Sequence, residues 1–173
     1  MKRLIQAEWK VLIRRSSARG LLFVSALLPA LVALTLGAVS GSDLTLNGQP
    51  VSEVFSFSGP HTATLSLRIR HALVLPIFIL FVTGSSFATE RANHMLRERL
   101  VRPASRDSML ISKMVALLLL CGVSLVLNAV MSISLGTILM GTDGPWGLVL
   151  LGHMFSLCTD LGLIALASLL STM

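Results

Sequence analysis

Four long runs of apolar residues, with few or no charges inside them, dominate this chain of 173 residues. A hydrocarbon core of ~30 Å requires about 20 helical residues at ~1.5 Å each, and the four runs meet or approach that length. They extend over 20–39, 71–88, 114–140 and 146–170. Only 13% of the residues are charged, against about 25% in ordinary soluble domains, which disfavours a water-soluble fold. The sequence therefore predicts an all-α integral membrane protein with about four transmembrane helices.

The distribution of basic residues predicts how these helices are oriented. Six Lys and Arg precede the first run, two lie between the first and second, six lie between the second and third, and none follows. Because cytoplasmic loops are enriched in Lys and Arg, both termini are expected in the cytoplasm of a cell that carries this protein in its inner or plasma membrane. The basic residues in these three groups are Lys2, Arg3, Lys10, Arg14, Arg15 and Arg19; Arg68 and Arg70; and Arg91, Arg97, Arg99, Arg102, Arg106 and Lys113.

The apolar runs and the charged residues between them divide the chain, which is expected to form one domain (1–173), into segments. These are an interfacial helix (1–19), spans at 20–39, 71–89, 108–140 and 146–173, an external loop (40–70) and a cytoplasmic segment (90–107). The net charge of +6 is assigned to topology and to contact with anionic lipids, so nucleic acid is not expected as a partner. The first span could also be a cleaved signal peptide, but its apolar run exceeds the usual length of about 7 to 15 residues and further spans follow it.

The segment before the first span has the pattern of an amphipathic helix. Apolar residues recur at helical spacing while charged residues fill the remaining circumference. We expect this helix to lie in the cytoplasmic membrane interface with Trp9 at headgroup level; a solvated charged lead-in is the alternative. In the external loop, Asn47-Gly48 between short apolar alternations predicts a small hairpin with a type I′ turn.

The cytoplasmic segment between the second and third runs carries a narrow apolar edge on an otherwise charged helix. Met95, Leu96, Leu100 and Val101 form that edge, and Pro103 should end or turn the helix. A short helix lying across the membrane face is expected, with one side on the bundle and the other in water. The alternative is that its charges only fix the topology and keep the loop solvated.

In this segment the chain resembles the ABC-2 type permeases, which are membrane subunits of many bacterial ABC exporters. The residues that carry the resemblance are Glu90, Leu100, Pro103, Ser105, Arg106 and Lys113. His94 and Met95 stand where the family typically has a Gly-Thr pair, which is a departure from its pattern. The amphipathic N-terminal segment and Pro76, early in the second span, also fit the family.

The resemblance implies a permease that is driven by a separate ABC ATPase subunit and pairs with a second permease copy or a homologous permease. The chain has no GxxxxGK[ST] phosphate-binding loop, so ATP and Mg²⁺ are expected on the ATPase and no cofactor, metal or catalytic residue in this chain. Family members usually have six spans, so the chain is expected to be a fragment or a shortened relative. The residues expected to receive the push of the ATPase are Glu90, Arg97, Arg99, Leu100, Pro103, Ser105, Arg106 and Lys113.

Polar residues inside the apolar runs are the other candidates for function. His153, Ser156 and Asp160 share one face of the fourth span, and Asn128 belongs to a small and polar stripe of the third span that favours helix packing. The functional hypothesis places them along a substrate path. The structural alternative is that Asp160 is protonated or bonded to a neighbouring helix. Two further alternatives are a membrane enzyme that uses His153 and Asp160 as an acid/base pair, and a non-transporting assembly or immunity subunit.

Overall fold

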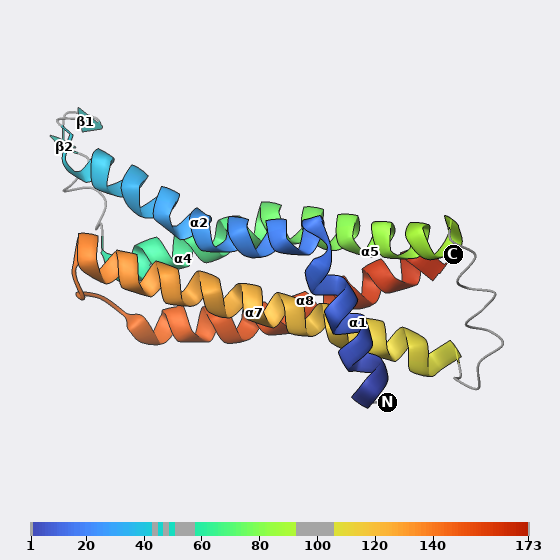
Figure 1. Ribbon diagram of the computed structural model, residues 1–173. Coiled ribbons are helices and arrows are strands. Elements are labelled where there is room, and N and C mark those ends of the chain that lie inside the picture. The colour runs from blue at the N-terminus through green and yellow to red at the C-terminus, as the bar shows by residue number, and fades with distance from the viewer. Residues whose placement is uncertain (1, 43–44, 47–48, 51–57, 93–105, 173) are drawn as a thin grey trace.

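The computed structural model describes residues 2–42, 45–46, 49–50, 58–92 and 106–172, and these form long helices, their connections and one small hairpin (Figure 1). Within these described residues, four helical segments are long and apolar enough to cross a membrane. They are Ser16–Ser40, Gly59–Val82, Leu110–Met140 and Trp146–Leu166. The prediction of an all-helical membrane protein with four spans is therefore confirmed.

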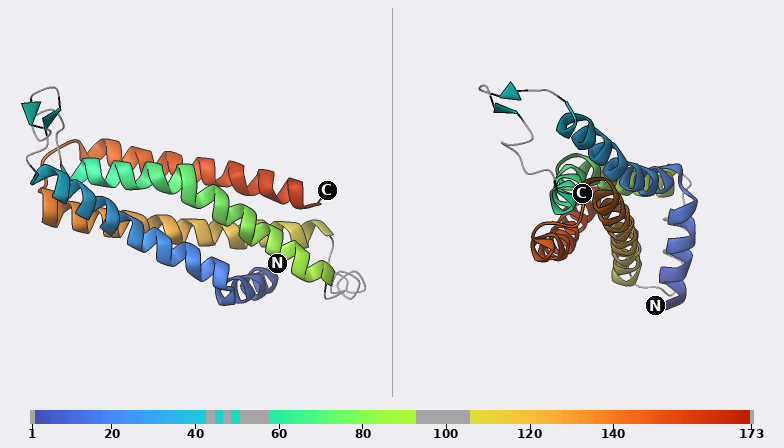
Figure 2. Two further views of the ribbon diagram at one scale, coloured as in Figure 1. Left: turned by 90° about the horizontal axis from the view of Figure 1, so that it is seen from above. Right: turned by 90° about the vertical axis from the view of Figure 1, so that its left-hand side faces the viewer.

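The spanning helices run side by side in one bundle (Figures 1 and 2). The bundle consists of α2 (Ser16–Ser40), α4 (Gly59–Ile69), η1 (Arg70–Val74), α5 (Leu75–Ala92), α7 (Arg106–Met140) and α8 (Trp146–Thr172). Helix α7 contacts α2, α4 and α8, so it is the helix around which the others pack. Large apolar side chains such as Phe23, Leu34 and Phe155 are more than 60% exposed. Such an apolar outer surface suits lipid as the surrounding solvent.

Helix α1 (Lys2–Arg14) crosses the bundle steeply instead of continuing α2 (Figures 1 and 2). Leu12 is buried and Trp9 packs against the same apolar core, while Lys2, Lys10 and Arg14 are exposed. This is the expected amphipathic helix, although it ends earlier than the predicted segment 1–19. The backbone turns at Arg15, which is extended (φ −71°, ψ 139°), and α2 begins at the next residue.

The second span differs from its prediction. The sequence placed a loop over 40–70 and a span over 71–89, whereas a helix begins at Gly59 and continues through η1 into α5. Serine and threonine lowered the apolar character of this stretch, but their hydroxyls are satisfied inside the helix: Thr64 Oγ1 donates to the Pro60 carbonyl at 2.6 Å and Ser66 Oγ to the Ala63 carbonyl at 3.0 Å. Polar residues so bonded are tolerated in a span.

A π-helical turn joins α4 to α5. The Leu75 N–H bonds to the Arg70 carbonyl, five residues back. Pro76 follows directly; it has no N–H to donate, and its ring would clash with the Ala72 carbonyl in a regular α-helix. The wider turn absorbs that clash, and the ribbon changes direction there (Figure 2).

One end of the bundle carries the hairpin and the short connection from α7 to α8. Strands β1 (Thr45–Leu46) and β2 (Gln49–Pro50) pair antiparallel, as the sequence predicted for a hairpin; its two turn residues lie outside the described residues. At the same end the start of α4 touches the end of α7. A Cβ placed on Gly136 would lie 2.9 Å from the Gly59 carbonyl oxygen, so the two backbones are in direct contact.

Candidate functional site

Arg70 lies fully buried in the middle of the bundle. Its position at the start of η1 points the guanidinium toward α7 and α8, where all three of its nitrogens find acceptors. Nε donates to Ser124 Oγ at 3.3 Å, Nη1 to Ser156 Oγ at 3.4 Å and Nη2 to the Cys121 carbonyl oxygen at 3.2 Å. A fully buried arginine is stable only when its donors are satisfied, and here they are.

Asp160 supplies the opposite charge. Its carboxylate, also 0% exposed, places Oδ2 3.3 Å from Arg70 Nη2, and Oδ1 3.6 Å from His71 Nδ1. His71 lies at the edge of the bundle, with Nε2 2.9 Å from Thr159 Oγ1. An unpaired Asp at the centre of a span costs at least ~2.5 kcal/mol. The arginine removes most of that cost by pairing.

Hydroxyl and amide groups extend the contacts to a fourth helix. Ser124 Oγ, which accepts from Arg70, lies 2.9 Å from Ser25 Oγ on α2. Asn128 Nδ2 donates to the Ser25 carbonyl at 3.3 Å. We call the resulting set the buried network. Its members are Ser25, Arg70, Cys121, Ser124, Asn128, Ser156 and Asp160. His71 and Thr159 border it at the edge of the bundle.

Three of the four residues expected on a substrate path belong to the buried network. Ser156 and Asp160 contact Arg70 directly, and Asn128 joins through Ser25. His153 does not join them, because its Nδ1 lies 2.7 Å from the Val149 carbonyl of its own helix. The suggested acid/base pair is thus not assembled, since the charged partner of Asp160 is Arg70. Among the residues that the structure describes, no group of three His, Cys, Asp or Glu side chains could hold a metal ion.

Sequence reasoning missed Arg70. A polar stretch precedes Arg70, so the hydropathy pattern predicts a loop up to this residue and an apolar run that begins at His71. One signal was available: an aspartate within the fourth span requires a cationic partner at a similar depth. Arg70 directly adjoins the second apolar run, which makes it the candidate for that cationic partner in the sequence.

The residues expected to couple to an ATPase are described only at the two ends of their segment. Glu90 lies in the last turn of α5, and Arg106 is the first residue of α7. Lys113 lies further along α7 and is only 8% exposed, so it is not on an open cytoplasmic surface. The other five lie outside the described residues; they are Arg97, Arg99, Leu100, Pro103 and Ser105.

Comparison with known proteins gives one match. The family model described as an ABC-2 family transporter protein matches residues 4–173, a range that includes all four candidate spans. No curated protein and no solved structure matches the chain.

Proposed function

The chain belongs to the ABC-2 family of transporter proteins, and on that premise we propose that it is the membrane subunit of an ATP-driven exporter. The observation that carries the proposal is the extent of the family match, which covers α1 and all four spans together. The energy would come from a separate ATPase subunit, because the sequence contains no GxxxxGK[ST] loop to bind a triphosphate. Two copies, or this chain and a homologous permease, would form the pathway.

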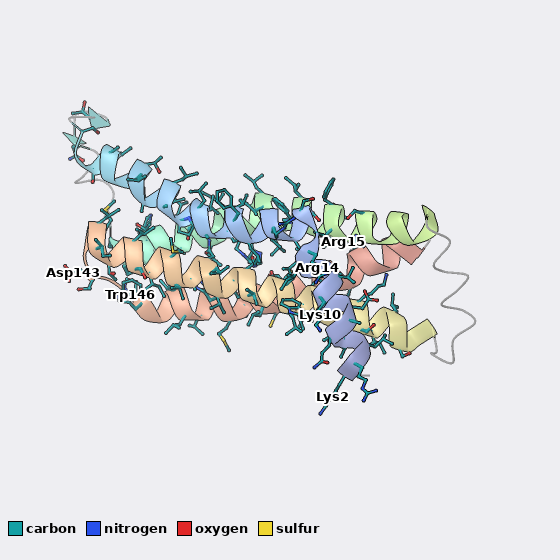
Figure 3. The ribbon with its side chains drawn as sticks, viewed as in Figure 1. Lys2, Lys10, Arg14, Arg15, Asp143 and Trp146 are labelled. Carbon is teal, nitrogen blue, oxygen red and sulfur yellow. The ribbon has the colours of Figure 1, made fainter. Side chains whose placement is uncertain are left out.

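We place the α1 end of the bundle in the cytoplasm. Lys2, Lys10, Arg14 and Arg15 gather there, whereas Asp143 and Trp146 lie at the opposite end (Figure 3). The basic groups of α1 are suited to the anionic inner leaflet. The same end holds the last turn of α5 and the first turn of α7, so the segment joining them would face the cytosol and the ATPase (Figure 1).

The buried network offers a route from that segment to the centre of the bundle. Arg70 is the first residue of η1, which leads directly into α5, and Ser124 lies on α7. Both helices that flank the coupling segment therefore lead to residues of the buried network. Nucleotide-driven closure of the ATPase would displace α5 relative to α7 and so shift the contacts of Arg70. A ligand or partner shifts the equilibrium between two arrangements of the helices only by binding one of them more tightly. The network supplies discrete contacts that such a displacement would break or re-form.

The proposal is tested first by its partner. A tagged chain isolated from its native membrane in mild detergent should bring an ATP-binding subunit with it. ATP hydrolysis should be measurable in that complex and absent from the chain alone. If the isolated chain, without an ATPase, catalysed the turnover of a substrate, this result would support a membrane enzyme and contradict the exporter.

Charge reversal in the coupling segment tests the mechanism. Arg97→Glu, Arg99→Glu and Arg106→Glu should each reduce transport-coupled ATP hydrolysis several-fold, because each places a carboxylate where the ATPase is expected to press. Insertion of the chain into membranes should not change. The matched control is Arg14→Glu on α1, an exposed cation outside the segment. Full transport in all three segment variants would refute the assignment.

A further inference from the structure

Arg68 differs from Arg70 in its surroundings, although it lies only two residues earlier in the same helix. Two residues of an α-helix turn by about 200°, so the two side chains leave the helix on opposite sides. Arg70 is 0% exposed and paired with Asp160, whereas Arg68 is exposed on the outside of the bundle. Within the described ranges, no carboxylate forms an ion pair with Arg68.

The outward face of α4 borders a pocket of about 310 Å³ at the hairpin end of the bundle. His61, Thr64 and Arg68 line it from successive turns of α4. Apolar side chains complete its walls, because Leu65 and Leu148 line it from α4 and α8. The pocket therefore combines three polar groups with leucine side chains that border the surrounding lipid. The polar groups are the guanidinium of Arg68, the imidazole of His61 and the hydroxyl of Thr64.

A pocket of this kind beside a spanning helix suits a ligand that has both an anionic group and an apolar part. Arg68 lies about 13 Å along the helix from Gly59, at a rise of ~1.5 Å per residue. At that depth water is scarce, and a cation without a partner is costly unless its side chain reaches toward the interface. Trp146, a residue type enriched at the membrane interface, directly follows Pro145, which lines the pocket. Asp143, the exposed acid of the α7–α8 connection, is not among the residues that line the pocket.

We propose that this pocket binds an anionic phospholipid from the leaflet at the hairpin end, with the lipid phosphate on Arg68 and His61 and an acyl chain along Leu65 and Leu148. Arginine binds phosphate oxygens through paired N–H groups. An anionic headgroup adds a net negative charge that attracts Arg68, whereas the choline cation of phosphatidylcholine offsets the charge of its phosphate. The site lies on the opposite face of α4 from the buried network. It does not depend on the transported substrate or on an ATPase.

Trp146 gives a local readout of the bound lipid. The sequence has two tryptophans, Trp9 and Trp146, so Trp9→Phe leaves only Trp146, the residue after the pocket residue Pro145. The full chain with this substitution is placed in vesicles of phosphatidylcholine that contain brominated phosphatidylglycerol or brominated phosphatidylcholine, and quenching of Trp146 is measured. We expect phosphatidylglycerol to be enriched about fivefold near Trp146, the factor that one basic side chain near a membrane surface supplies.

Two variants remove the site in different ways. Arg68→Gln should reduce the enrichment to near one, and Thr64→Glu should do the same by pairing its carboxylate with Arg68. Arg68→Lys should keep most of the enrichment, and Arg14→Gln, at the other end of the bundle, should keep all of it. If Arg68→Gln fails to fold, Thr64→Glu decides the question. Unchanged enrichment in both Arg68→Gln and Thr64→Glu, or its abolition in the intact site by inorganic phosphate, would overturn the lipid assignment.

Discussion

The guanidinium of Arg70 is held by four other residues from two neighbouring helices, and this explains why a charge can lie at the centre of an apolar bundle. Asp160 neutralises it, while Ser124, Ser156 and the Cys121 carbonyl accept its remaining hydrogen bonds. A buried pair of this kind adds little stability compared with well-packed apolar residues, but loss of one partner leaves a charge with no partner. The pair therefore fixes which faces of η1 and α8 meet.

Removal of either charge alone should destabilise the bundle. Arg70→Gln or Asp160→Asn is expected to cost about 3–5 kcal/mol, because the remaining charge stays buried without its partner. The double variant should recover part of that loss, since neither charge remains. Thermal unfolding of the detergent-solubilised chain, followed by the loss of monodisperse protein, measures all three. Equal stability of the single variants and the parent chain would contradict the pairing.

Hydropathy alone placed three of the four spans close to where they lie and misplaced the start of the second. The spans expected over 108–140 and 146–173 agree closely with α7 (Arg106–Met140) and α8 (Trp146–Thr172). Residues 59–70 contain Ser, Thr and two arginines, so a window of apolar residues could not recognise them as helical. Two kinds of contact accommodate its polar residues: local ones, in which hydroxyls bond to carbonyls of the same helix, and a tertiary one, in which Arg70 bonds across the bundle. The network itself could be predicted only in part, because Asp160, Ser156 and Asn128 are candidates from the sequence while Arg70 and Ser25 are not.

The contact between the start of α4 and the end of α7 depends on two glycines. A Cβ on Gly136 would lie 2.9 Å from the Gly59 carbonyl oxygen and 3.1 Å from the Gly59 Cα. Small residues allow helices in membranes to approach this closely, and such packing contributes to their association. The neighbouring atoms are backbone, so the helices themselves must separate to make room for a larger residue.

Gly136→Ala should therefore destabilise the bundle by about 1–3 kcal/mol, the usual range for forcing extra methyl groups into a packed contact. Gly122→Ala is the matched control on the same helix, because a Cβ at Gly122 has no atom within 4 Å. That control should be neutral or slightly stabilising, since alanine favours helix over glycine. Thermal unfolding in detergent compares the two variants. An equal effect of both would show that the close contact does not matter for stability.

At the scale of the whole molecule, the two ends of the bundle differ in a way that suits a transporter subunit. One end carries α1 with its exposed cations, the last turn of α5 and the first turn of α7. The other end carries the hairpin and the Gly141–Pro145 connection (Figure 1). Correcting the second span changes the charge count but not the orientation it predicts. Arg68 and Arg70 no longer count toward the outer loop, because both lie within the span Gly59–Val82, so the expected asymmetry between the two sides increases.

Cysteine labelling of intact cells tests this orientation directly. In a chain with Cys121→Ala and Cys158→Ala, a cysteine at Asn47 should react with a membrane-impermeant maleimide from outside, because the hairpin end is expected to face outward. A cysteine at Arg97 should react only after the cells are opened, since the cytosol is where an ATPase can reach it. The matched control is a cysteine at Val126, an exposed apolar position midway along α7, which lipid should shield in both conditions. Labelling of position 97 in intact cells would place the coupling segment outside, where no nucleotide-driven subunit could act on it, and the exporter mechanism would fail with the topology.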